Sequence, residues 1–309
     1  MKLFSLEVLS GILNTMVGLS TPFLYAALGE TFAQTAGVVN LGVDGIMLIS
    51  AFAAFYVALA TGSLWLGLLT AALVGLAMGL LMSLVSVTLK AEQGVSGIGL
   101  YMFGMGMSSL LFKVLIGTVK TIEGFKSLRV PLLADIPFLG PILFRHDVLV
   151  YGAFLLVPFS WWILEKTSLG IKLKAVGQNP AAADSVGISV NRVRYLAVCI
   201  GATLAGVAGA SLSIAQLDLF QDNLTAGQGC IAVALVYFGG WRPAGVLAGA
   251  LLFSVANSFQ LWMQVLGVKV PPSVAVMLPY ILTILALTVT ANRARQPAAL
   301  NKPFERGES

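Results

Sequence analysis

Long apolar stretches dominate the chain, and short polar segments separate them. A helix that crosses a lipid bilayer needs about 20 predominantly apolar residues. The stretches without Asp, Glu, Lys or Arg are Val8–Gly29, Gly45–Leu89, Gln93–Phe112, Val148–Leu164, Tyr195–Leu217, Asn223–Trp241, Pro243–Val268 and Val270–Asn292. Gly45–Leu89 is long enough for two crossings. The pattern therefore predicts an all-α polytopic membrane protein with about nine transmembrane helices, within a range of eight to ten.

The predicted spans begin and end where charged or turn-forming residues interrupt the apolar pattern. A turn at Thr61–Ser63 divides the longest stretch into the second and third spans. The spans are predicted at Leu9–Gly29, Ile46–Leu89 (two spans), Gly94–Leu115, Val148–Leu164, Tyr195–Ser213, Cys230–Gly240, Ala244–Leu266 and Ser273–Thr290. The first stretch is longer than the apolar core of a signal peptide, so we expect it to remain as a span.

Composition agrees with a membrane protein. Of 309 residues, 58% are hydrophobic and only 10% are charged, whereas a soluble domain has about 25% charged residues. We expect residues 1–292 to form one transmembrane domain and residues 293–309 to form a disordered tail. The net charge of +5 does not indicate nucleic-acid binding, because Lys and Arg lie mostly near span ends, where they set orientation or meet lipid head groups.

The most clearly structured polar segment is the loop at residues 165–194. Within it, Asn179 is a good N-cap, Pro180 a good first helical residue and Gly187 a good C-terminal stop. These signals predict a helix of about two turns. Four basic residues flank it, namely Lys172, Lys174, Arg192 and Arg194. Such a helix is typical of a docking surface; the alternative is a helix that only lies on the membrane.

Orientation follows from the distribution of Lys and Arg, which are enriched on the cytoplasmic side. The 165–194 loop holds five of them and the tail holds four, so both are predicted to be cytoplasmic. Counting back through five spans places the N-terminus outside. The segment Lys113–Asp147, predicted to be extracytoplasmic, also carries five basic residues, so the bias is not uniform.

Two glycine-rich polar breaks, Thr35–Gly45 and Gln216–Gly229, precede apolar segments. Non-helical backbone at membrane depth is tolerated only where protein or a water-filled cavity surrounds it. In the predicted topology the two breaks face opposite sides, which is the relation expected of an inverted repeat; chance similarity is the alternative. Small residues four apart, as at Gly75–Gly79 and Gly201–Gly209, allow close helix packing, either within the chain or at a subunit interface.

Few groups in the chain could supply chemistry or energy. The sequence has no Gly-x-x-x-x-Gly-Lys-Ser/Thr phosphate loop and no metal-ligand or nucleophile spacing. The acids Glu30, Asp44, Asp218 and Asp222 all fall at predicted breaks, where capping and function are both open interpretations. We therefore expect a protein that is not an enzyme, has no cofactor of its own, and takes its driving energy from another subunit.

Three blocks carry a family resemblance. Thr21–Leu48, Lys174–Val190 and Gly227–Phe253 resemble, in matching order, the signatures of ABC-importer permeases of the branched-chain amino acid, simple sugar and nucleoside group. The Gly-Glu-Thr-Phe-Ala run at Gly29–Ala33 and the Gly-Gly-Trp-Arg-Pro run at Gly239–Pro243 are most similar to purine-nucleoside permeases, and the length resembles the shorter permease of such systems.

The resemblance implies a function and partners. It implies a nucleoside or simple-sugar permease subunit in the bacterial cytoplasmic membrane. Its implied partners are a second homologous permease, an ABC ATPase that holds ATP-Mg, and an extracytoplasmic substrate-binding lipoprotein. It also implies that the loop helix is the ATPase-coupling element, formed by Asn179, Pro180, Ala181, Ala182, Ala183, Asp184, Ser185 and Gly187. A self-sufficient channel or secondary carrier, or a structural assembly subunit, is the alternative.

Substrate contacts are expected at the breaks and on the polar face of the eighth span. The candidates are Asn40, Asp44, Asn257 and Gln260. Asn257 and Gln260 are three residues apart, so they share one helix face. Hydrogen bonding between helices is the alternative role for them.

Overall fold

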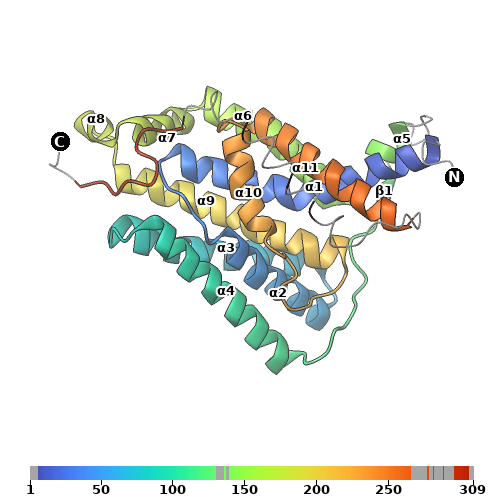
Figure 1. Ribbon diagram of the computed structural model, residues 1–309. Helices are drawn as coiled ribbons and strands as arrows, with labels where there is room; N and C mark the ends of the chain where they lie inside the picture. Colours follow the sequence, from blue (N-terminus) through green and yellow to red (C-terminus); the bar gives the residue numbers. More distant parts are fainter. Residues whose placement is uncertain are drawn as a thin grey trace.

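The computed structural model describes residues 6–129, 139–265 and 296–305, together with residues 136, 277, 281 and 288. Within these ranges the protein is a bundle of α-helices (Figure 1). A two-stranded antiparallel pair, β1 (Leu128–Arg129) and β2 (Arg145–His146), accompanies it. The prediction of an all-α membrane class is confirmed at this level.

Seven described helices are long and apolar enough to cross a membrane. They are α1 (Leu6–Thr35), α2 (Val43–Thr61), α3 (Leu64–Ser83) with the π-helical turn η1 (Leu84–Thr88), α4 (Gln93–Leu115), α6 (Val148–Lys166), α9 (Val190–Ser211) with the π-helical turn η2 (Leu212–Gln216), and α11 (Pro243–Val265). The shorter helices are α5 (Leu139–Leu143), α7 (Ser168–Gln178), α8 (Pro180–Ser185) and α10 (Gln228–Phe238).

One predicted span within the described residues is too short to be a membrane crossing. The segment predicted as the seventh span forms α10, whose 11 residues are too few to cross a bilayer. The ninth predicted span, at 273–290, lies outside the described ranges apart from single residues. The count of nine and the inverted repeat therefore stay predictions.

The first helix continues beyond the predicted span. The sequence pattern ends it at Gly29 because Glu30 follows, but α1 runs to Thr35 and buries Glu30. A charged residue is a poor stop signal when polar partners inside the protein surround it, as they do here.

Helix α9 is the most enclosed of the seven long helices and packs against α1, α2 and α3. Its small residues make this possible. A Cβ on Gly201 would meet the backbone of Gly29, and one on Gly206 would meet the backbone of Ala71. The small-residue spacings therefore serve core packing within the chain, which was the first of the two interpretations.

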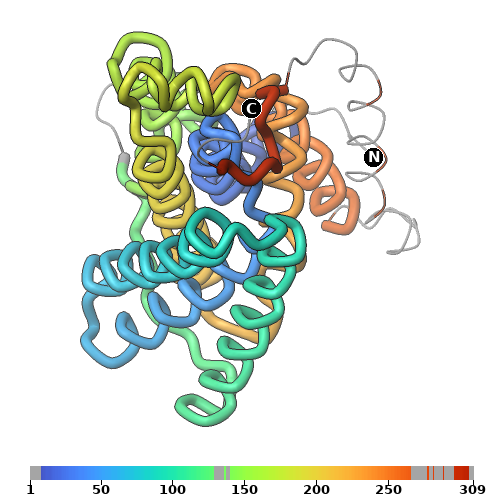
Figure 2. The backbone as a smooth tube through the Cα atoms, turned by 90° about the vertical axis from the view of Figure 1, so that its left-hand side faces the viewer, coloured from blue at the N-terminus to red at the C-terminus, as the bar shows by residue number. Residues whose placement is uncertain are grey.

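The two ends of the bundle carry different elements. Helices α7 and α8 and residues 296–305 lie at one end, and α5, β1 and the start of α1 lie at the other (Figure 1). Figure 2, which faces the first end, shows residues 296–305 beside α7. Helix α7 belongs to the 165–194 loop, which the sequence predicts to be cytoplasmic. The loop and the tail therefore share one side, as the charge distribution predicts.

Residues 296–305 differ from the disorder expected for the tail. They form hydrogen bonds to residues far away in the sequence, for example from the Ala299 N–H to the Gly177 carbonyl at 2.9 Å. Pro297 and Ala299 are buried. Composition alone suggested disorder because the segment is short and polar, and the surface that receives it is built from other parts of the chain.

Candidate functional site

Helix α8 has the caps that the sequence predicts. The Asn179 side-chain oxygen accepts a hydrogen bond from the Ala182 N–H at 3.0 Å, and Pro180 occupies the first turn. At the other end Gly187 has a φ of +84°, and the Ile188 N–H donates to the Ala183 carbonyl at 3.0 Å. This is the glycine-terminated cap in which a left-handed residue closes the last turn. The predicted short capped helix is confirmed, and its coupling role stays a prediction.

A second helix in the same loop was missed by the sequence analysis. Helix α7 begins after Thr167, whose side chain accepts from the Gly170 N–H at 3.3 Å. Leu173 and Val176 are buried on one face. The N-cap and the spacing of these apolar residues were the available signals. Together α7 and α8 make the loop a folded unit instead of a connector with one helix.

The outer side of α8 presents small side chains. Ala181, Ala182 and Ser185 are exposed, whereas Ala183 is buried against the bundle. Val186, just after the helix, is 75% exposed, and Ile171 of α7 in the same loop is 66% exposed. The small exposed side chains of α8 leave its backbone open to close approach by another protein.

The four basic residues that flank α8 have different environments. Lys174 forms an exposed ion pair with Glu165 at 2.7 Å. Lys172 and Arg192 are exposed, but Arg194 is only 1% exposed and donates from Nη1 to the Lys302 carbonyl at 3.0 Å. Of the four basic residues, Lys172, Lys174 and Arg192 therefore lie on the surface, whereas Arg194 is part of the buried core.

The two glycine-rich breaks meet at Asp44. Its carboxylate, fully buried, accepts from the Gly229 N–H at 2.8 Å and from the Thr225 hydroxyl at 3.0 Å. Helices α2 and α10 both begin within the bundle instead of at its ends (Figure 1). A carboxylate at the N-terminus of a helix satisfies otherwise unpaired N–H groups. Asp44 therefore joins the N-terminal ends of two interrupted helices.

A polar network fills the space beside the first break. Glu30 Oε1 accepts from the Asn40 N–H at 2.9 Å and from the Gln34 side-chain amide at 3.1 Å. The Trp241 indole N–H donates to Gln34 Oε1 at 2.9 Å. Gln34 and Trp241 were missed by the sequence analysis. The signal for Gln34 was its spacing of four residues from Glu30, which places both on one helix face.

The sequence candidates do not form a single cluster. Asn40 accepts from the Gly42 N–H at 2.9 Å and is buried beside the Glu30 network, four residues from Asp44. Asn257 and Gln260 are half-buried on α11, and no hydrogen bond within the described residues joins them to Asn40 or Asp44. The structure therefore brings the two breaks together and leaves the α11 pair apart from them.

The remaining acidic candidates have structural surroundings. Asp222 lies 4.0 Å from Lys113 in an exposed ion pair. Asp218, in the connection after η2, accepts a hydrogen bond from the Gly124 backbone N–H. Burial raises the pKa of its carboxyl above the ordinary value. Neither lies beside Asp44 in the hydrogen-bond network, which favours the capping and interfacial interpretation for these two.

The fold and these features define a class of protein. Seven membrane-capable helices, two buried breaks and a folded polar loop at one end are typical of a subunit that moves a solute across a membrane.

The family is shown by comparison with known proteins. Residues 12–287 match the family described as the permease component of the branched-chain amino acid transport system, and the chain belongs to that family. It is the membrane permease subunit of an ABC importer. Permease components of this kind translocate the solute and work with other subunits of an ATP-driven complex.

Three relatives are similar over most of their length. The chain is 36% identical to the guanosine ABC transporter permease protein NupQ of Bacillus subtilis, over 98% of both chains. It is 39% identical to the putative glucose ABC transporter permease protein TsgC13 of Haloferax volcanii, over 85% of this chain and 81% of that one. It is 34% identical to the nucleoside ABC transporter permease protein NupC of Lactococcus lactis subsp. cremoris, over 93% and 94%. No solved structure matches the chain at a significant level.

Proposed function

We propose that this subunit carries nucleosides, or related simple sugars, inward across a bacterial cytoplasmic membrane. The observation that carries the proposal is full-length similarity to permeases whose names specify guanosine and nucleosides. A nucleoside is uncharged, so its path needs hydrogen-bonding groups more than fixed charge. The buried network of Glu30, Gln34, Asn40 and Trp241 offers such groups next to an aromatic side chain.

The substrate path is proposed to pass the junction of the two breaks. Asn40 and Asp44 lie there, and Asn257 and Gln260 are proposed as contacts from α11 at another level of the path. Interrupted helices that begin within a bundle are where transporters commonly bind their solutes. Movement of the solute then needs a two-state rearrangement of the helices around the junction.

The partners are proposed to be a second homologous permease, an ABC ATPase and an extracytoplasmic binding lipoprotein. Helix α4 supports the first, because it is the least buried of the seven long helices and leaves an apolar face for lipid or a neighbouring subunit. The ATPase is proposed to bind α8 on the cytoplasmic side, through Asn179–Gly187. The tail shares that end of the bundle, which supports a cytoplasmic C-terminus.

The coupling role of α8 can be tested by capture of the ATPase from detergent-solubilised membranes. The Pro180→Gly, Asp184→Arg double variant loosens the first turn of α8 and reverses a charge on it. We expect the unmodified protein to bring down an ATPase and the variant to lose it, because the docking helix is frayed and electrostatically altered.

The matched control is Asp222→Arg, a charge reversal away from α8 that should leave ATPase capture unchanged. Uptake of a labelled nucleoside is measured in the same strains. Uptake that persists in cells lacking every co-purifying ATPase would contradict the proposal and favour a self-sufficient carrier.

A further inference from the structure

Residues 296–305 tie together three elements at the α8 end of the bundle. The Ala299 N–H donates to the Gly177 carbonyl of α7 at 2.9 Å, and the Asn301 N–H donates to the Gly37 carbonyl at 3.2 Å. Arg194 of α9 donates to the Lys302 carbonyl at 3.0 Å. We call this segment the C-terminal strap. Its backbone is held by groups from α7, from the first break and from α9.

The strap also reaches the connection between α3 and α4. The Glu305 carboxylate pairs with the Lys90 ammonium at 2.8 Å. Backbone N–H groups of Val95 and Gly94, together with the Asn301 side chain, hold the pKa of Glu92 below its ordinary value. The strap thus contacts α7, the first break, α9 and the connection between α3 and α4.

Arg194 gives a physical reason for the strap to stay in place. Its side chain is 1% exposed, and Nε and Nη2 have no hydrogen-bond partner among the described residues. Burying a guanidinium with few partners is costly. If the strap moved away, the Arg194 guanidinium would also lose its hydrogen bond to the Lys302 carbonyl. The buried cation therefore favours the strap in its bound position.

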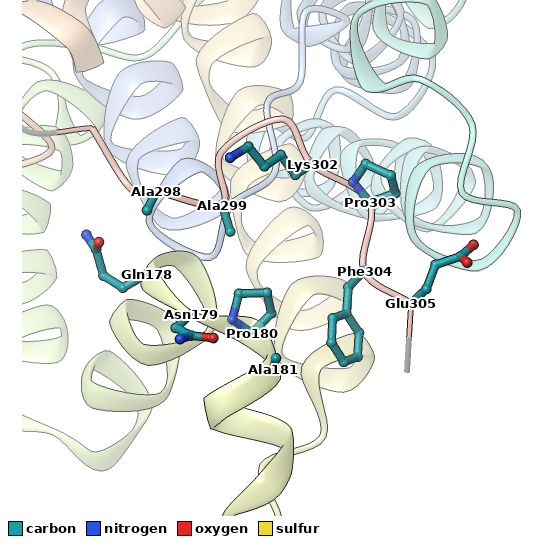
Figure 3. Close-up of a pocket in the computed structure, with 10 residues that line it drawn as sticks. All are labelled: Gln178, Asn179, Pro180, Ala181, Ala298, Ala299, Lys302, Pro303, Phe304 and Glu305. Carbon is teal, nitrogen blue, oxygen red and sulfur yellow. The ribbon is translucent and has the colours of Figure 1, made fainter. Parts of the chain in front are cut away.

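Phe304 of the strap lines two clefts that both reach α8. One cleft, of about 640 Å³, is lined by Asn179, Pro180 and Ala181 on one side and by Ala298 and Lys302–Glu305 on the other (Figure 3). The second, of about 450 Å³, includes Lys90, Asp184, Gly187 and Arg192. Phe304 packs against the same apolar cluster as Ala183 of α8. The strap and α8 therefore form one continuous surface.

We propose that the C-terminal strap is part of the surface that the ATPase subunit covers, alongside α8. This inference rests on the proposed function, which assigns the ATPase to this end. A stable interface uses about 20–30 residues on each side, and Asn179–Gly187 supplies far fewer. The strap faces α8 across the larger cleft, so a partner that covers the helix and fills the two clefts contacts Lys302, Pro303 and Phe304.

The strap also gives the bound ATPase a route to the first break. The Asn301 N–H of the strap donates a hydrogen bond to the Gly37 carbonyl. Gly37 lies three residues before Asn40, which belongs to the polar network. A movement of the ATPase that shifts the strap would therefore act on the break directly, in parallel with α8.

The test is a cysteine footprint on the permease in nanodiscs, with and without the co-purifying ATPase. The background carries Cys199→Ala and Cys230→Ala, which removes both free thiols. Ala181→Cys reports on α8, Pro303→Cys and Lys302→Cys report on the strap, and Leu128→Cys reports on the opposite end. All four positions are exposed. With the ATPase at ten times its Kd, only about a tenth of the permease is free of the ATPase at any moment. A covered thiol should therefore react with a maleimide about tenfold more slowly.

We expect Ala181→Cys and both strap cysteines to be protected, and Leu128→Cys to react equally in both states. Protection of Ala181→Cys without protection of either strap cysteine would overturn the inference and leave the proposed function standing. No protection of Ala181→Cys by a bound ATPase would overturn the proposed docking on α8 as well. Two strap cysteines are used so that misfolding of one variant still leaves a decisive result.

Discussion

Replacing Asp44 by alanine is expected to abolish uptake and to lower the thermal stability of the protein. The substitution leaves the buried Gly229 N–H and Thr225 hydroxyl without their acceptor. An unsatisfied buried polar group costs about 1–3 kcal/mol, and here the loss also separates the two interrupted helices that the carboxylate joins. Stability is measured as the temperature of half-maximal aggregation in detergent, and uptake in reconstituted vesicles with the partner subunits.

Asp44→Asn is the matched control for this prediction. Its side-chain oxygen can still accept from Gly229, and the Thr225 hydroxyl can accept from the new amide. We expect it to keep most of the stability and uptake. If Asp44→Asn folds and assembles normally yet transports nothing, the negative charge itself is needed by the substrate path, and joining the two helices is not the whole role of Asp44.

Replacing Gly206 by valine should destabilise the bundle strongly. A Cβ at this position would lie 2.4 Å from the Ala71 carbonyl oxygen, closer than side chains tolerate, and 3.2 Å from the Gly75 Cα of α3, which is a tight contact. Both obstacles are backbone atoms, so α3 and α9 must separate. Overpacking of this kind costs about 1–3 kcal/mol or more. A lower yield of folded protein in detergent and a lower aggregation temperature are the expected results.

Gly106→Val is the matched comparison, because Gly106 is also helical but has nothing within 4 Å of its Cβ position. Both variants carry the same cost of a β-branched residue in a helix. Equal stability of the two variants would contradict the assignment of Gly206 to close packing between α3 and α9, and would return the small-residue spacing to the alternative of a subunit interface.

The sequence by itself determined the features that depend on neighbouring residues. The long apolar runs predicted six of the seven membrane-capable helices closely, and α1 in part, because the cost of exposing polar groups to lipid acts on every residue of a span. Asn179, Pro180 and Gly187 predicted α8 and both of its caps, because capping bonds reach only two to five residues along the chain.

The tertiary structure alone decided the features that depend on distant residues. Glu30 lies inside α1 because Asn40 and Gln34 satisfy it, so its charge did not end the helix as the pattern predicted. Asp44 meets Gly229 across 185 positions, and no local signal pairs the two breaks. The C-terminal strap is ordered by Gly37, Gly177 and Arg194, which three separate elements supply. Periodicity and composition describe how each segment meets lipid or water, whereas these contacts exist only once the helices have packed.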